Sequence, residues 1–309
     1  MPVIETKNIT KRYASHLALD QVSIDVPQGS VFGLLGPNGA GKTSLIRIIT
    51  RITAPDEGEV FFNGDRLKEE HIYRMGYLPE ERGLYKKMEV GEQLLYFARL
   101  KGLTRHDALV KLKDWVEKFE IKSWWNKKVE ELSKGMQQKI QFIATVVHKP
   151  HLIILDEPFS GFDPINVNLV TTEILRLREE GASIIFSTHR MESVEQLCDY
   201  ITLINRSKKV LEGSVKSVRE QFRTHTYILE YSGGNLVTGD VAEILSDVED
   251  GEGRRKAVVH LQEQGSSNEL LKQVMNGVTV LKFEEQLPGM QEIFIRVVEE
   301  RGPGISLAS

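Results

Sequence analysis

The chain has 309 residues, of which 40% are hydrophobic and 27% charged, as in ordinary folded globular proteins. At roughly 150 residues per domain, this length predicts about two domains. The formal net charge of -4 gives no general excess of Lys and Arg, so we expect no nucleic-acid partner. The only cysteine, Cys198, excludes an internal disulfide. The start lacks a signal peptide and no run approaches ~20 apolar residues, so a cytoplasmic location is expected.

The first predicted elements surround a glycine-rich loop. Alternating apolar and polar residues predict a strand over 18–26, followed by a turn at 27–29. The apolar run Val31–Leu35 predicts a second strand, and a helix is expected over 44–49. The loop therefore connects a strand to a helix.

The middle of the chain alternates helices with apolar strands. The spacing of apolar residues predicts mainly helix over about 90–149 and a helix over about 167–180, which Gly181 caps. Strands are expected over 152–155 and 183–186. Buried strands that alternate with helices predict a parallel sheet covered by helices.

A change of character near residue 213 predicts a second, small α/β domain. A hairpin around Arg206 and Ser207 precedes it. The elements beyond are predicted strands and helices over 227–231, 257–261, 278–283, Ser267–Met275 and Met290–Glu300. We expect domains at 1–213 and 214–301, with a disordered tail at 302–309.

The sharpest motif is Gly-Pro-Asn-Gly-Ala-Gly-Lys-Thr at 36–43, which fits the phosphate-loop pattern G-x-x-x-x-G-K-[ST]. Its glycines let backbone N–H groups approach phosphate oxygens, and the following helix adds the positive end of its dipole. Lys42 is expected to reach the β- and γ-phosphates, and Thr43 to give its hydroxyl to Mg²⁺. The predicted nucleotide-binding residues here are Gly36, Pro37, Asn38, Gly39, Ala40, Gly41, Lys42, Thr43 and Ser44.

Two further motifs carry polar groups to strand and helix ends. Asp156 and Glu157 follow the strand over 152–155, at the end where α/β sheets bind ligands. Asp156 is expected to hold Mg²⁺ and Glu157 to act as general base on water. Ser133 and Gly135 begin a helix and can bind an anion there. In isolation, each motif also fits a simple strand end or helix cap.

Over about 1–213, the chain resembles the nucleotide-binding domain of ABC transporters. The resemblance rests on three motifs that occur in the family's order: the phosphate loop, the Leu-Ser-x-Gly element at 132–135 and the Asp156-Glu157 pair. The resemblance implies an α/β P-loop NTPase fold of ABC type. That fold has a mixed sheet core, an antiparallel β subdomain and a helical subdomain at about 88–150. It also implies ATP and Mg²⁺ as cofactors, and contacts from Ser133 and Gly135 to the γ-phosphate held by a second subunit. Lys134 and Met136 depart from the family signature.

The same resemblance assigns four more residues. Tyr13 matches the aromatic residue that stacks on adenine, and Asp163 matches the acidic member of a loop that contacts the facing subunit. His189 matches the histidine that senses the γ-phosphate. Glu80 stands where the family commonly has glutamine, and can still bind Mg²⁺ through water. The expected catalytic residues are therefore Glu157, His189 and Lys42, and the expected metal-binding residues are Thr43, Glu80 and Asp156.

The implied function is an ATP-hydrolysing subunit that energises an ABC membrane transporter. Its expected partners are integral-membrane permease subunits and a second copy or paralogue, bound through the nucleotide sites at the inner face of the membrane. The run over 77–85 resembles a bacterial sodium or drug export branch, which implies an exporter. Two alternatives stay open: an ABC ATPase without a membrane partner, acting on ribosomes or DNA, and a nucleotide-binding regulator whose second domain senses a ligand.

Overall fold

A computed structural model describes residues 1–81, 83–251, 253–262 and 265–300. The chain divides into two compact units, Met1–Val215 and Lys216–Ser309. This division lies two residues beyond the boundary expected from the sequence. The tail predicted to be disordered, 302–309, lies outside the described residues.

The first unit begins with an antiparallel sheet of order β2-β1-β5-β6, in which β3 also pairs with β1. Its strands are β1 (Pro2–Tyr13), β2 (His16–Val22), β3 (Asp25–Pro27), β5 (Glu57–Phe62) and β6 (Asp65–Arg66). The prediction of one strand over 18–26 is wrong, because β2 and β3 are separate. Asn8 in β1 has a φ of 51°, and its N–H donates to the Ser23 hydroxyl (2.8 Å), so the ladder is interrupted there.

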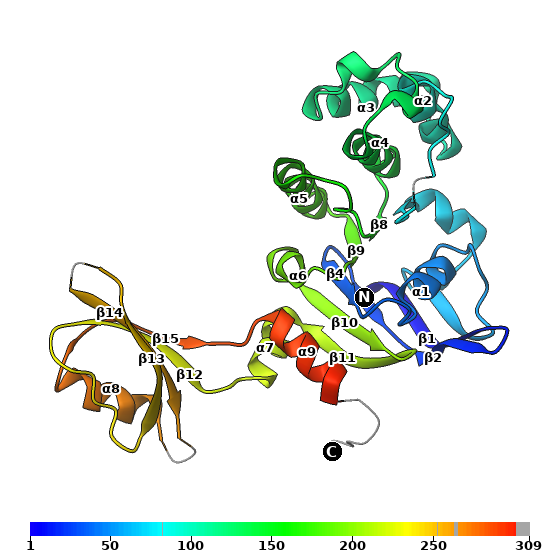
Figure 1. Ribbon diagram of the computed structural model, residues 1–309. Helices are drawn as coiled ribbons and strands as arrows, with labels where there is room; N and C mark the ends of the chain where they lie inside the picture. The colour runs from blue at the N-terminus through cyan, green and yellow to red at the C-terminus, as the bar shows by residue number, and fades with distance from the viewer. Residues whose placement is uncertain (82, 252, 263–264, 301–309) are drawn as a thin grey trace. The chain divides into compact units, whose positions relative to one another are not determined.

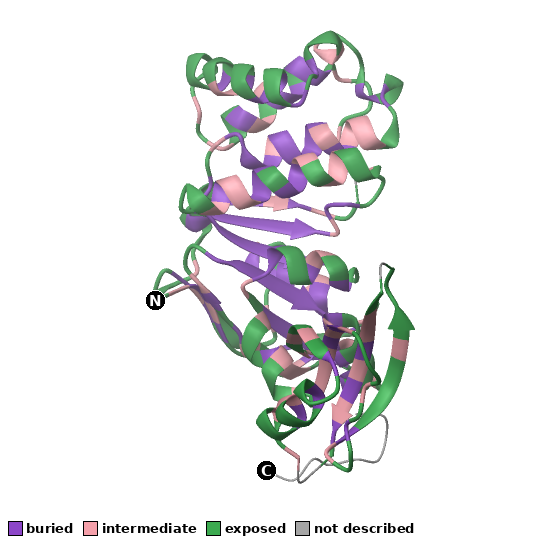
Figure 2. Cartoon of the chain, turned by 90° about the vertical axis from the view of Figure 1, so that its left-hand side faces the viewer, coloured by how far each residue is buried: buried purple, intermediate pink, exposed green. Residues whose placement is uncertain are grey.

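A six-stranded sheet of order β11-β10-β4-β9-β8-β7 forms the centre of this unit. Its neighbouring strands are parallel, except for the hairpin β10–β11. Every residue of β4, β8 and β9 is buried, as the purple strands of Figure 2 show, so apolar residues predominate in all three. The strands are β4 (Val31–Leu35), β7 (Met75–Leu78), β8 (Leu152–Asp156), β9 (Ser183–Ser187), β10 (Tyr200–Asn205) and β11 (Lys208–Ser214).

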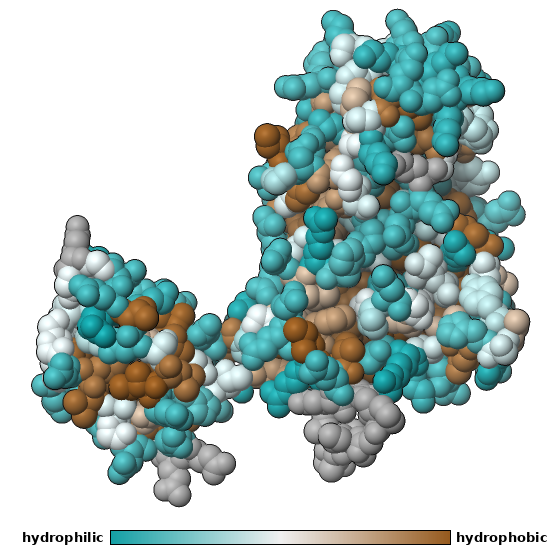
Figure 3. All heavy atoms as spheres, in the orientation of Figure 1, coloured by the Kyte–Doolittle hydropathy of each residue, from teal (hydrophilic) through white to brown (hydrophobic). Residues whose placement is uncertain are grey.

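Helices surround this sheet and build the predicted helical region, where α2 contacts α3 and α4 (Figure 1). On the face shown in Figure 3, that region carries mostly hydrophilic side chains. The bounds are α1 (Lys42–Ile49), η1 (Glu69–Arg74), α2 (Val90–Leu100), α3 (Arg105–Lys118), η2 (Lys122–Trp124), η3 (Val129–Glu131), α4 (Lys134–Val146), α5 (Pro164–Glu179) and α6 (Met191–Leu197). Among the described helices, none is both long and apolar enough to cross a bilayer.

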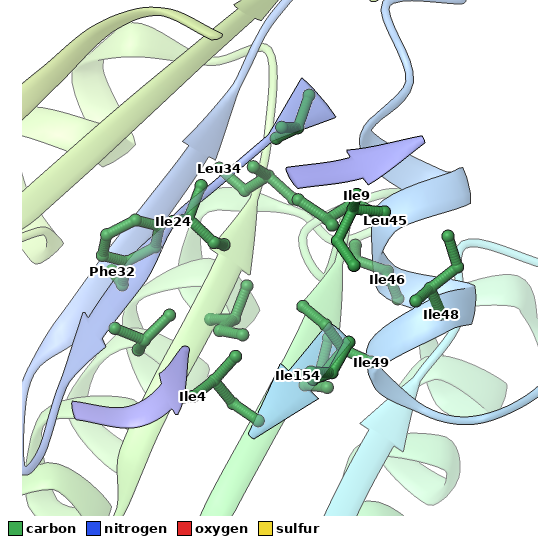
Figure 4. Packing of buried hydrophobic residues seen from close by; sticks show 14 of the residues in the cluster. Ile4, Ile9, Ile24, Phe32, Leu34, Leu45, Ile46, Ile48, Ile49 and Ile154 are labelled. Atoms are coloured by element: carbon green, nitrogen blue, oxygen red, sulfur yellow. The ribbon is translucent and has the colours of Figure 1, made fainter. Parts of the chain in front are cut away.

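One hydrophobic cluster of the first unit lies around α1. Buried side chains of α1 meet residues of β1, β4 and β8, as Figure 4 shows for Ile46, Ile9, Leu34 and Ile154. Helix α1 is therefore packed on several strands, and the loop before it is fixed at both ends.

The second unit contains one antiparallel sheet of order β13-β14-β12-β15. Leu229, Tyr231 and Val259 of the sheet form a core with Leu270 and Val274 of α8. The predicted helices are confirmed, but β13 was not predicted, because most of its residues are exposed and a bulge breaks its alternation. The elements are α7 (Val215–Gln221), β12 (Thr226–Ser232), β13 (Ala242–Glu249), β14 (Arg254–Leu261), α8 (Ser267–Met275), β15 (Thr279–Gln286) and α9 (Met290–Glu300).

Candidate functional site

The glycine-rich loop between β4 and α1 needs glycine at two crowded positions. Gly36 and Gly41 have φ angles of 148° and 115°. A Cβ on Gly36 would lie 2.2 Å from the carbonyl oxygen of Ile204, and one on Gly41 would lie 2.3 Å from that of Ala18. The loop is therefore held tightly between β10 and β2, with the first N–H groups of α1 at its end.

Ser207, in the turn between β10 and β11, supports the same loop from behind. Its N–H donates to the carbonyl of Ala40 (3.3 Å), and its hydroxyl donates to the carbonyl of Leu17 (2.5 Å). Arg206 and Ser207 both have positive φ, as expected for the predicted hairpin turn. This turn thus joins the loop to β2.

Lys42 is the first residue of α1, and its side chain lies over the loop. Its ammonium donates to the carbonyls of Gly36 (2.7 Å) and Pro37 (3.1 Å). Burial lowers the pKa of Lys42, and the carboxylates of Glu157, Asp156 and Glu80 act in the opposite direction. The charge therefore lies where phosphate oxygens would meet both the ammonium and the N-terminus of α1.

Oxygen ligands suited to a magnesium ion gather beside Lys42. The Thr43 hydroxyl lies 3.5 Å from Asp156 Oδ2, and Glu80 lines the same cavity. Burial raises the pKa of Asp156, and the negative charges of Glu80 and Glu157 act in the same direction. No cluster of three or more His, Cys, Asp or Glu suited to a metal occurs among the described residues. A hydroxyl and carboxylates fit Mg²⁺, which commonly completes its shell with water and substrate phosphates.

Glu157 and His189 are brought together from the ends of β8 and β9. His189 Nδ1 lies 2.8 Å from Glu157 Oε1, and the Thr188 hydroxyl donates to Oε2 (3.4 Å). An ionised carboxylate only accepts hydrogen bonds, so His189 can donate from Nδ1 to Glu157 when the carboxylate is ionised. Glu157 has a φ of 49°, and its N–H donates to the carbonyl of Ser187 (2.9 Å). Such strain in a non-glycine residue is common at functional sites.

A cavity of about 380 Å³ unites most of the predicted site residues. His16 and Ala18 also line this cavity, and the sequence did not predict them. No strand was predicted over β1, so the pairing of Tyr13 with β2 was unknown. The lining residues are Tyr13, His16, Ala18, Asn38, Gly39, Gly41, Lys42, Thr43, Ser44, Glu80, Asp156, Glu157 and His189.

Tyr13 is held by contacts on one side. Lys11 Nζ lies 5.5 Å from the centre of its ring and 2.8 Å from Asp56 Oδ1. Asp56 Oδ2 also accepts the backbone N–H of Arg12 (2.6 Å). Hydrogen bonds from Lys11 and Arg12 lower the pKa of Asp56. Asp56 was not predicted, since nothing near it in the sequence indicates this contact.

Ser133, Gly135 and Asp163 form a second group away from this lining. The Ser133 hydroxyl accepts the N–H of Met136 (3.3 Å), and Asp163 Oδ1 accepts that of Asn166 (2.9 Å), so both cap helices. A Cβ on Gly135 would lie 3.3 Å from the carbonyl oxygen of Gly161. The start of α4 therefore adjoins the loop before α5.

Comparison with known protein families matches both units. The family described as ABC transporter matches residues 19–160, and that described as ATP-binding protein DrrA1-3-like, C-terminal domain, matches residues 213–298. The ABC transporter ATP-binding protein YhaQ of Bacillus subtilis (strain 168) is 40% identical over 94% of this chain and 97% of its own length. The bacitracin transport ATP-binding protein BcrA of Bacillus licheniformis is 30% identical over 96% of this chain and 97% of its own. The Nod factor export ATP-binding protein I of Burkholderia pseudomallei (strain 1710b) is 35% identical over 70% of this chain and 72% of its own length.

Solved structures share the fold of the first unit. A structure of the ATP-binding subunit of an ABC transporter is similar at a TM-score of 0.67 and 28% identity, covering 71% of this chain and 93% of its own. The dimeric structure of MJ0796, a bacterial ABC transporter cassette, is similar at a TM-score of 0.63 and 21% identity. The match covers 69% of this chain and 98% of that structure's chain. The predicted fold class is confirmed.

The fold and the matches define an ATPase of the cassette type, in which a phosphate loop precedes α1 and a carboxylate pair ends β8. The chain belongs to the family of ABC transporter ATP-binding proteins. It binds ATP and is the ATP-hydrolysing subunit of a transporter, as the sequence predicted. Subunits of this family dimerise and work with membrane permease components.

Proposed function

We propose that this chain drives export across a membrane by hydrolysing MgATP between two copies of itself, at the inner face of the bilayer. The names of BcrA and of the Nod factor export protein support a transport role of this kind. The observation that carries the proposal is the convergence of Lys42, Asp156, Glu157 and His189 on one cavity.

Lys42 and the N–H groups at the start of α1 would bind the β- and γ-phosphates, because both present positive charge to the loop. Thr43, Asp156 and Glu80 would hold Mg²⁺, whose charge offsets that of the phosphates when it is bound. Glu80, Asp156 and Glu157 add negative charge beside Lys42, so we expect phosphate binding to require Mg²⁺.

The reaction requires a water whose oxygen attacks the γ-phosphorus in line with the bond to the β-phosphate oxygen. As the new P–O bond forms, Glu157 accepts a proton from that water, the old P–O bond breaks, and ADP leaves with its electron pair. His189 holds the Glu157 carboxylate through the 2.8 Å contact. These residues act mainly by positioning the water and its base.

Ser133, Gly135 and Asp163 would act on the nucleotide of the other copy. In support, none of the three is among the described residues that line the cavity around Lys42. Ser133 and Gly135 lie at the N-terminus of α4, whose N–H groups are suited to a phosphate. ATP would then join two copies, since its γ-phosphate needs donors from both. The permease subunits are the expected membrane partners.

The first test is Glu157→Gln, with Glu117→Gln on the exposed face of α3 as a matched control. We expect Glu157→Gln to bind ATP, to lose turnover by about 10²- to 10⁴-fold, and to form a lasting dimer in MgATP. Turnover and light scattering measure these outcomes. Normal hydrolysis by Glu157→Gln would exclude Glu157 as the base, and full activity of Lys42→Ala would contradict the phosphate-loop assignment.

A further inference from the structure

The hairpin of β1 and β2 places a second ring opposite Tyr13. Tyr13 pairs directly with His16 across a two-residue turn, so their side chains lie on the same face of the hairpin. Both residues line the cavity that contains Lys42. Both are exposed, so their rings are accessible to a ligand.

Strand β2 runs along the cavity from this hairpin end towards the phosphate loop. His16 and Ala18 are two residues apart, and both line the cavity, as expected for one face of a strand. The carbonyl of Ala18 lies directly against Gly41 of the loop. Ala18 therefore marks the phosphate end of β2, and His16 lies beyond it, at the nucleoside end.

The Lys11 ammonium lies over one face of the Tyr13 ring. Asp56 holds both the Lys11 ammonium and the Arg12 backbone. A base would then stack on the opposite side of the ring. A stacked base leaves its edge and the ribose unpaired, and His16 is the residue opposite Tyr13 in the hairpin.

We propose that His16 is a nucleoside-contacting residue that works with Tyr13, which supplies the stacking face. This inference rests on the proposed ATP site. A neutral imidazole carries one donor and one acceptor, both suited to the polar edge of a purine or to ribose hydroxyls. His16 thus supplies affinity for the nucleoside and none for the triphosphate.

The test compares two ligands with the full chain by calorimetry in the presence of Mg²⁺. One is the β,γ-methylene analogue of ATP, and the other is inorganic tripolyphosphate, which lacks a nucleoside. We expect His16→Ala to weaken binding of the analogue about 5- to 10-fold, the value of one hydrogen bond, and to leave tripolyphosphate binding unchanged. His16→Gln keeps a donor and an acceptor, and should recover part of the loss.

Ser15→Ala changes the neighbouring turn residue and is the matched control, with no change expected. Unchanged analogue binding by His16→Ala would overturn the proposal, as would an equal loss for both ligands. Failure of the proposed ATP site is distinguishable, because Lys42→Ala would then bind both ligands like the unsubstituted chain.

Discussion

Glu157 and His189 meet at the carboxyl ends of two adjacent parallel strands, β8 and β9, with 2.8 Å between Oε1 and Nδ1. Residues distant in sequence thus form one unit, in which the imidazole orients the carboxylate. The pairing of the two strands sets this geometry, since Asp156 lies opposite Ser187 in their register.

His189→Ala should therefore slow hydrolysis while leaving ATP binding nearly intact. A hydrogen bond to a charged group is worth about 1.5–3 kcal/mol, or about 10- to 150-fold in kcat. Steady-state ATPase assays would separate kcat from KM. A variant that raises KM alone would show that His189 binds the nucleotide and does not orient Glu157.

Asp156→Asn should stabilise the fold and slow turnover at neutral pH. Burial raises the pKa of Asp156, so its ionised form costs folding free energy. The variant's gain in the free energy of unfolding should be full above the raised pKa of Asp156. The gain should shrink as the pH falls from that raised pKa to the ordinary pKa of an aspartate. Denaturant titrations at several pH values measure it, and activity should fall on the order of 100-fold. Lower stability of the variant at pH 7 would contradict this reasoning.

Gly36→Ala should destabilise the first unit more than Gly39→Ala. Both glycines have positive φ, which costs an alanine about 1 kcal/mol or more. A Cβ on Gly36 also meets the Ile204 carbonyl at 2.2 Å, whereas one on Gly39 has no described atom within 4 Å. We expect about 1–3 kcal/mol of additional loss for Gly36→Ala, seen as a lower urea midpoint. Equal midpoints would show that the loop can shift away from β10.

Asp56→Ala should raise the KM for ATP about two- to fivefold and leave kcat unchanged. The effect is small because exposed ion pairs contribute little free energy. The variant releases Lys11 and the Arg12 backbone, which hold Tyr13. Asp65→Ala, in the short strand β6, is an exposed control. A loss of kcat at constant KM would place the effect of Asp56 in catalysis instead.

The sequence was most informative where structure is local or fully buried. Val31–Leu35 and the loop after it were predictable, because an apolar run and a glycine pattern are read without knowing any partner. The hairpin at Arg206 was predictable for the same reason. These segments account for the phosphate end of the site.

Features that depend on distant pairing could not be predicted. Strand β13 exposes most of its side chains, so it lacks the alternation of a half-buried strand. The contact of His16 with the cavity depends on its register opposite Tyr13. Asp56 reaches Lys11 only because β1 and β5 are paired. Such contacts are set by the sheet and not by neighbouring residues.

The support of Ala40 by Ser207 has a consequence for synthesis on the ribosome. The phosphate loop leaves the exit tunnel early, but Ser207 and the Ile204 carbonyl that enclose it are made near the end of the first unit. At 5–20 residues per second, the nascent loop waits on the order of 10 s for them. A growing chain should therefore gain tight nucleotide binding only after the β10–β11 hairpin emerges.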